Sequence, residues 1–141
     1  MLRSSAVATA VLTALSVLTA RIVLARGGGF PRAVQFFDLQ PVEDPRGPVA
    51  ALRPDAHRAA RVASRVLRLP VLWTSCLPTS IALAKVLLRH RIQPDIVLGV
   101  SATGTRRFAA HAWVEASGHR LDPSEFPPGR YKPAGRFRLV H

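Results

Sequence analysis

Apolar residues recur at helical spacing in three stretches of the chain, and each stretch predicts a helix. The first is an uncharged run over residues 4–20, which lies between Arg3 and Arg21. A helix over this run would pack on the rest of the protein through a stripe of apolar side chains. The members of that stripe are Val7, Val11, Ala14, Leu15 and Leu18.

Two other interpretations of residues 4–20 compete with the packed helix. A basic start followed by an apolar run resembles a signal peptide, with Leu18-Thr19-Ala20 as a weak cleavage site. A membrane span needs about 20 strongly apolar residues. This run is a little shorter and is diluted by Ser and Thr residues. We favour the packed helix here, with membrane association through this run as the alternative.

The second helical pattern begins at Asp55, which follows Pro54 and is a good N-cap. One face of this helix is apolar and consists of Ala56, Ala59, Ala60, Ala63, Val66 and Leu67. The other face is basic and consists of Arg58, Arg61, Arg65 and Arg68. We interpret the basic face as solvated or, alternatively, as a docking face for an acidic partner.

The third helical pattern begins near Cys76, the single cysteine of the chain, and runs to about His90. Its spacing predicts a buried face made of Leu77, Ile81, Ala84, Val86, Leu87 and Leu88. Either Thr74 or Ser75 could be the N-cap, and Pro78 fits the first turn, where its missing N–H has no helical partner. Cys76 is therefore expected at the helix N-terminus, where free backbone N–H groups and the helix dipole favour the thiolate.

Past Arg91, apolar and other residues alternate, which is typical of strands. The alternation predicts strands over about residues 96–100, 108–116 and 120–122. Turns are expected at residues 102–105 and at Gly118. The strands follow the helices along the chain, so these patterns predict an α+β fold in which the Cys76 helix packs on a small antiparallel sheet.

Two proline-rich stretches, residues 30–54 and 123–141, predict little regular structure. Their large apolar side chains are candidates for anchoring them to the surface: Phe36, Phe37, Leu39, Phe126, Tyr131, Phe137 and Leu139. We divide the chain into residues 1–54, an apolar helix with a proline-rich connection, and residues 55–141, the domain that holds Cys76.

Composition places the chain among globular proteins, with 48% hydrophobic and 20% charged residues over 141 positions. One cysteine excludes an intramolecular disulfide and a zinc site built on several cysteines, and it suits a reducing compartment such as the cytoplasm. We expect no cofactor and no metal. The net charge of +12 attracts anionic partners, either nucleic acid or an acidic protein or peptide. Zinc-finger spacing, RNA-binding aromatic motifs and long basic runs are missing from the sequence, so a nucleic-acid partner is not expected.

A cysteine nucleophile needs a nearby base, and the base needs an orienting group. The best candidate base is His111, which on a strand shares one face with Trp113 and Glu115. The other histidines stand on a basic helix, at a helix end, in a turn and at the last position. We expect these four to be solvated: His57, His90, His119 and His141.

The candidate orienting group is Asp122, on the strand that follows the turn. A two-residue loop, either Ser117-Gly118 or Gly118-His119, puts Asp122 on the face of His111, whereas a three-residue loop turns it to the other face. Glu115 competes locally for the same role. The sequence thus predicts a catalytic triad of Cys76, His111 and Asp122.

The predicted triad stands among short stretches that are shared with a known family. They are Cys76-Leu77-Pro78, Leu87-Leu88-Arg89, Arg91-Ile92, Gly99-Val100, Ala110-His111-Ala112-Trp113-Val114-Glu115 and Gly118. This pattern resembles the B2 proteins of lasso-peptide biosynthesis, which are transglutaminase-like cysteine peptidases. The resemblance covers about residues 55–122, and its most specific part is the His-Ala-Trp-Val-Glu block with the upstream Cys-Leu. It implies that the family's catalytic Cys, His and Asp correspond to Cys76, His111 and Asp122.

The resemblance also implies a function and partners. Proteins of this family cut the leader from a ribosomally made precursor peptide, and a separate cyclase then joins the new N-terminus of the core to an acidic side chain. In split systems a small B1-type recognition protein presents the leader. The segment before residue 55 leaves no obvious room for such a domain, so a separate partner is expected. Competing functions are a transglutaminase-type acyl transferase, and an inactive basic module that binds peptide or nucleic acid.

Overall fold

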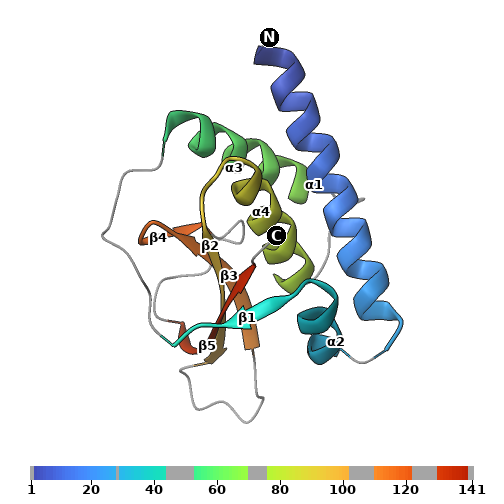
Figure 1. The fold of residues 1–141 in the computed structure, drawn as a ribbon, viewed down its shortest axis with the longest axis vertical. Coiled ribbons are helices and arrows are strands. Elements are labelled where there is room, and N and C mark those ends of the chain that lie inside the picture. Colours follow the sequence, from blue (N-terminus) through green and yellow to red (C-terminus); the bar gives the residue numbers. More distant parts are fainter. Residues whose placement is uncertain are drawn as a thin grey trace.

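The described part of the chain forms a sheet with helices packed on it. The computed structural model describes residues 2–27, 29–43, 53–69, 76–101, 110–121 and 130–139. Within these residues, helices cover one face of a five-stranded antiparallel sheet (Figure 1). The predicted α+β fold is therefore confirmed.

The sheet contains β1 (Leu39–Pro41), β2 (Pro94–Ser101), β3 (Ala110–Ala116), β4 (His119–Leu121) and β5 (Tyr131–Leu139), in the spatial order β1-β5-β2-β3-β4. The strands predicted from alternation are β2, β3 and β4. The turn between β3 and β4 is Ser117-Gly118, in which both residues have a positive φ, 51° and 77°. This two-residue loop is the first of the alternatives considered above, and the other two are wrong.

Four helices belong to the described part of the chain: α1 (Leu2–Ala25), α2 (Gly29–Phe36), α3 (Pro54–Leu67) and α4 (Cys76–Arg89). The central helix is α4, which contacts α1 and α3 on one side and β2 and β3 on the other (Figure 1). Its apolar periodicity is confirmed, because Ile81, Ala84 and Leu87 are fully buried. Pro78 lies in its first turn, as predicted.

The start of α3 differs from the prediction by one residue. Arg53 is the N-cap and Pro54 occupies the first helical position, so Asp55 lies in the first turn and is not the cap. The pKa of the exposed Asp55 carboxyl is below its ordinary value. Partial desolvation raises it, but the N–H of Ala56 and the charge of Arg53 together outweigh that effect. The predicted apolar face is confirmed by the buried residues Ala56, Ala59, Ala60, Ala63 and Leu67.

The helix predicted over residues 4–20 is confirmed as α1, but the face predicted to pack is wrong. Four residues of the predicted stripe are exposed, at 63%, 52%, 57% and 44%: Val7, Val11, Leu15 and Leu18. The residues that α1 buries are mostly small or hydroxylated: Thr9, Thr13, Ser16, Val17, Ala20 and Val23. Thr9 and Thr13 each donate a hydrogen bond to the carbonyl oxygen four residues earlier, at 2.9 and 2.7 Å. Because their hydroxyls are satisfied inside the helix, they can face α3 and α4 without a cost for unpaired polar groups.

Both proline-rich stretches contain regular structure, which the sequence did not predict. Most of α2 and all of β1 fall within residues 30–54, and α2 accommodates Pro31 in its first turn. In the tail, β5 is a nine-residue strand although it includes Pro133. The pairing of β2 with β5 shifts between Leu98 and Gly99, opposite Pro133, so a bulge accommodates the proline. Three of the predicted anchors are buried, namely Phe37, Leu39 and Leu139. A fourth, Phe36, is 60% exposed.

The two faces of the sheet have different surroundings. Ile96, Val114 and Leu139 point toward the helices and belong to one buried apolar cluster, which also contains residues of α1, α2, α3 and α4. Strand residues alternate between faces, so Asp95 and Trp113 lie on the opposite face. The sheet therefore separates an apolar core from a face that carries polar and aromatic side chains.

Candidate active site

Cys76 is the first residue of α4 and is half-buried with a free thiol. The first N–H groups of a helix have no intrahelical partner, and the helix dipole is positive at this end. A short connection leads from α4 into β2, and the two elements pack together, so they run antiparallel. The N-terminus of α4 therefore lies at the end of the sheet where β2 ends and β3 begins.

His111 is the second residue of β3 and is only 5% exposed. Its ring stacks on Trp113, with 6.1 Å between ring centroids and an interplanar angle of 26°. The ring of Tyr131 also lies close to that of His111, with 5.1 Å between ring centroids and an interplanar angle of 34°. The structure thus brings Cys76 and His111 to the same end of the sheet, with the His111 ring on the face opposite α4. Asp122 lies outside the described residues.

Gly99 gives the Trp113 ring its place on the sheet. Gly99 pairs with His111 across β2 and β3. A Cβ atom added at Gly99 would lie 2.5 Å from Trp113 Cζ3 and 3.0 Å from the Cβ of Tyr131. A residue with a side chain would therefore displace one of the two rings that enclose His111. The absence of a side chain here positions the aromatic neighbours of the candidate base.

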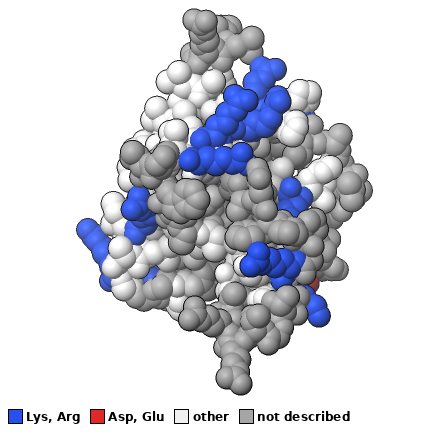
Figure 2. Space-filling view, turned by 180° about the vertical axis from the view of Figure 1, so that it is seen from behind, with Lys and Arg blue, Asp and Glu red and all other residues white. Residues whose placement is uncertain are grey.

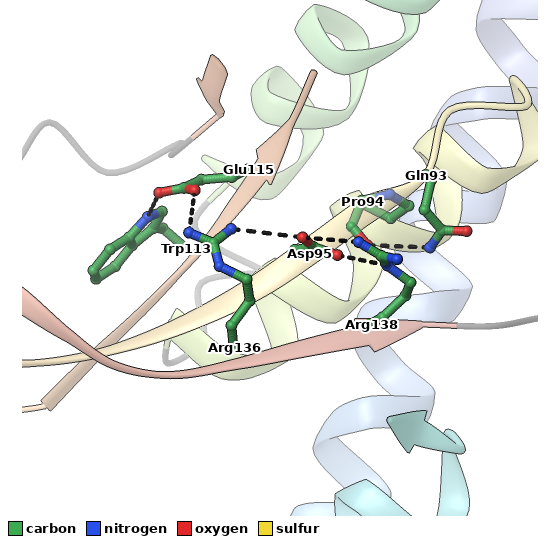
Figure 3. A network of polar contacts seen from close by, with 7 residues as sticks. All are labelled: Gln93, Pro94, Asp95, Trp113, Glu115, Arg136 and Arg138. Carbon is green, nitrogen blue, oxygen red and sulfur yellow. Dashed lines mark hydrogen bonds and ion pairs between the residues drawn. The ribbon is translucent and has the colours of Figure 1, made fainter. Parts of the chain in front are cut away.

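A network of polar contacts holds Trp113 through its indole N–H (Figure 3). The indole N–H of Trp113 donates to Glu115 Oε1 at 2.9 Å, and Glu115 Oε2 pairs with Arg136 at 2.7 Å. Arg136 also lies 3.6 Å from the carboxylate of Asp95. Arg138 donates to both oxygens of Asp95, at 2.9 and 3.2 Å. The network crosses β3, β2 and β5, so it fixes the indole relative to all three strands.

This network bears on the choice between Glu115 and Asp122 as the group that orients His111. Both carboxylate oxygens of Glu115 have partners, namely Trp113 and Arg136. Glu115 thus contacts the indole that stacks on His111, and each of its oxygens has a partner other than His111. The shared face of His111, Trp113 and Glu115, predicted from the alternation, is confirmed.

Sequence reasoning did not identify Asp95, Arg136 and Arg138, and it named Tyr131 only as a surface anchor. The reason is that residues 123–141 were not interpreted as containing a strand, so the strand partners of Asp95 were not known. Arg136 and Arg138 stand at alternate positions, as expected for two residues on one face of a strand, and this spacing was the available signal. Among the other histidines, His57 and His119 are exposed, whereas His90 lies 3.8 Å from the carboxylate of Asp55 at the end of α4.

Comparison with known proteins identifies the family. A family model described as the transglutaminase-like superfamily matches residues 14–134. The chain belongs to this superfamily. Searches of curated proteins and of solved structures gave no match to the chain.

Membership in the transglutaminase-like superfamily supports an enzyme fold, and its members often have cysteine protease or acyltransferase activity. Both activities need a thiolate nucleophile and a proton acceptor. In this transglutaminase-like chain the only thiol stands at a helix start, and a buried imidazole stands at the same end of the sheet. Acyl transfer to the sulfur of Cys76 with His111 as proton acceptor would require the two side chains to meet around the end of β3, since the His111 ring lies on the face of the sheet opposite α4.

Proposed function

We propose that the protein is a cysteine peptidase that removes the leader from a ribosomally made lasso-peptide precursor. The observation that carries this proposal is the position of Cys76 as the first residue of α4, at the end of the sheet where β3 begins with Ala110 and His111. Superfamily membership supports the thiol chemistry. The resemblance of the His-Ala-Trp-Val-Glu block and the upstream Cys-Leu to the B2 proteins supports the choice of substrate.

In the proposed mechanism, His111 accepts the thiol proton and the sulfur of Cys76 attacks the scissile carbonyl carbon. Backbone N–H groups at the start of α4 stabilise the oxyanion. His111 then donates the proton to the leaving amine, which becomes the N-terminus of the core peptide. Water hydrolyses the thioester, so the leader leaves as a carboxylic acid and the thiol is restored. Asp122 holds His111 in the tautomer that accepts the proton.

The proposed substrate requires partners. A precursor with a leader is the substrate, a separate B1-type protein presents the leader, and a cyclase uses the new N-terminus. The alternative acyl transferase would use the same residues and would pass the acyl group to an amine and not to water.

Product masses after incubation of a candidate precursor with the protein and its recognition partner test the proposal. Hydrolysis gives a leader fragment that carries one added water, whereas acyl transfer gives a fragment that carries the amine. Cys76→Ala should abolish product formation with an unchanged unfolding temperature, because the nucleophile is lost and the fold is kept. Cleavage by this variant at the wild-type rate would exclude the proposed mechanism.

Variants of His111, Asp122 and Glu115 distinguish the general base from the residue that orients it. His111→Ala should slow cleavage about 10²–10⁴-fold, since it removes the general base. Asp122→Asn should slow it less, because an orienting group can be partly replaced. Glu115→Gln should have the mildest effect on rate, since its contacts are with Trp113 and Arg136. If Glu115→Gln is the severe change and Asp122→Asn is silent, Glu115 is the orienting residue.

We also propose that α1 attaches the protein to the cytoplasmic face of an anionic membrane. Residues Ser5–Ala25 are apolar and long enough to cross a membrane, and 33% of this stretch is buried. Because α1 packs lengthwise on α3 and α4, an orientation in the membrane plane suits it. The exposed stripe of α1 then faces the acyl chains, and it consists of Val7, Val11, Leu15, Leu18 and Ile22. Exposed Arg21 and Arg26 at the end of α1, and the net charge of +12, complement anionic headgroups.

A further inference from the structure

A basic pocket lies between α3 and β4, apart from Cys76. Its volume is about 330 Å³. Five of its lining residues are Arg or His, and the other three are uncharged; the guanidinium of one of the five, Arg120, lies over the Trp113 ring. The five are His57, Arg61, Arg65, Arg68 and Arg120. We call this site the α3–β4 pocket.

The pocket revises the interpretation of the basic face of α3. Of the four arginines that were predicted to share that face, Arg61, Arg65 and Arg68 line the pocket, whereas Arg58 does not. In the face opposite to that of Figure 1, Lys and Arg side chains form a band across the upper part of the molecule, in the region of α3 (Figure 2). The basic face is therefore divided into arginines that line the pocket and Arg58, which lies outside it.

The positive charge of the pocket is not balanced by the acidic residues whose ion pairs are known. Asp95 and Glu115 pair with the arginines of β5, and Asp55 lies beside Arg53 and His90. Arg68 and Arg120 have additional contacts, so Arg61 and Arg65 are the cations that a ligand would engage first. Several guanidinium groups around one cavity repel each other, and an anion in the cavity relieves that repulsion.

The chemistry and size of the pocket favour carboxylate groups of a peptide. A guanidinium group forms paired hydrogen bonds with a carboxylate or a phosphate. The volume is at the lower end of the range of about 300–1,000 Å³ for ligand sites, which leaves room for one or two side chains. A nucleic-acid duplex would need an extended basic groove and not a small cavity.

The position of the pocket connects it to the candidate active site. The guanidinium carbon of Arg120 lies 4.6 Å from the centroid of the Trp113 ring, and that ring stacks on His111. Arg120 therefore joins the lining of the pocket to the aromatic stack that includes His111. A peptide side chain in the pocket would thus lie on the same side of the molecule as Arg120, next to this stack.

We propose that the α3–β4 pocket binds acidic side chains of the peptide substrate and so sets which peptides are presented to Cys76. This inference rests on the proposed function, since it assigns a recognition site to the same reaction. The ligand class is a peptide segment with one or two Asp or Glu residues near the scissile bond.

A binding experiment that involves no cleavage tests the pocket independently of the peptidase activity. The probes are a fluorescein-labelled peptide with two adjacent glutamates in a Gly-Ser background, and the same peptide with two glutamines. Both are titrated by fluorescence anisotropy at low ionic strength against the full-length Cys76→Ala protein. We expect the glutamate peptide to bind at least about tenfold more tightly than the glutamine peptide.

Two double variants of the Cys76→Ala protein, each with two Arg→Glu substitutions, distinguish binding in the pocket from attraction by the overall charge. Arg61→Glu with Arg65→Glu changes the pocket, and Arg58→Glu with Arg89→Glu changes exposed arginines outside it. Each pair lowers the formal charge from +12 by four units, to +8. The first pair should weaken binding of the glutamate peptide about tenfold or more, and the second should weaken it less than about threefold. Thermal unfolding verifies that both remain folded.

Three outcomes would overturn the proposal. Equal weakening by the two double variants would mean that overall charge and not the pocket attracts the peptide. Equal affinity for the glutamate and glutamine peptides would mean that carboxylates are not recognised. Stronger binding of inorganic phosphate than of the glutamate peptide, lost only in the pocket variant, would assign the site to phosphate. If peptide binding behaves as expected but no precursor is cleaved, the pocket stands and the proposed peptidase function fails.

Discussion

At the residue scale, Gly99 controls how Trp113 and His111 are arranged. Trp113 lies over Gly99, and its other edge is held by Glu115 through the indole N–H. The ring is thus restrained on both sides, and it cannot move away from an added Cβ without breaking that hydrogen bond or its stack with His111. A single glycine therefore determines the environment of the candidate base.

We predict that Gly99→Ala destabilises the protein and lowers activity. The added Cβ would stand 2.5 and 2.7 Å from two atoms of the Trp113 ring, and overpacking of this kind costs about 1–3 kcal/mol. The unfolding temperature should fall by roughly 3–10 °C. Gly135→Ala is the matched control on β5, since its Cβ would meet Phe137 at 3.4 Å, an ordinary contact. Equal losses in both variants, measured by differential scanning calorimetry, would contradict this account.

Residues with a local signal could be placed from the sequence, and residues without one could not. Cys76 was predicted at a helix start because a proline and an apolar period follow it directly. His111 was predicted on a strand because its neighbours alternate. The pairing of Asp95 with Arg138 joins residues 43 positions apart, and it depends on a register between β2 and β5 that no local pattern specifies.

At the element scale, α1 shows that periodicity identifies the apolar face of a helix but does not tell whether that face packs on the protein or is exposed. The most apolar stripe was predicted to pack, yet the buried stripe is the one with Thr9, Thr13 and Ser16. Hydroxyl groups that donate to a carbonyl oxygen of their own helix can be buried at little cost. The two faces of α1 therefore differ less in their tendency to be buried than their composition suggests. β5 was missed for a related reason, because Pro133 and Gly135 hide the alternation of a strand whose proline is accommodated by a bulge.

We predict that the exposed stripe of α1 binds anionic vesicles. Leu15→Ser with Leu18→Ser should reduce binding at least about tenfold, since burial of each leucine contributes about 1.5–3 kcal/mol. Leu69→Ser is the control, as Leu69 is similarly exposed, at 51%, but lies outside α1. Flotation with phosphatidylglycerol-containing vesicles and with pure phosphatidylcholine vesicles measures the effect. If the protein instead forms dimers that the α1 variant dissociates, and no vesicle binding occurs, the stripe is a subunit interface.

At the scale of the whole molecule, the charge is divided unequally between the inside and the surface. Asp95 and Glu115 are largely buried and pair with Arg136 and Arg138 on the polar face of the sheet. Most of the remaining arginines in the described part of the chain are exposed, and Arg61 and Arg65 of α3 line one pocket. The paired charges are shielded from salt, whereas the exposed ones repel each other and attract anions at long range. Stability and substrate capture should therefore respond to ionic strength in opposite directions.

We predict that raising the salt concentration stabilises the protein but slows its reaction with an acidic substrate. From about 0.01 to 0.15 M salt the Debye length falls from about 30 to 8 Å, so repulsion within a molecule of charge +12 weakens and the unfolding temperature should rise. Over the same range kcat/KM should fall, and kcat should stay nearly constant, because screening acts on association and not on the enclosed catalytic groups. The Arg61→Glu, Arg65→Glu variant should lose most of the salt dependence of kcat/KM and keep that of the unfolding temperature. A fall of both quantities with salt in the wild type would instead mean that exposed ion pairs stabilise the fold, and that the surface arginines act in stability and not in capture.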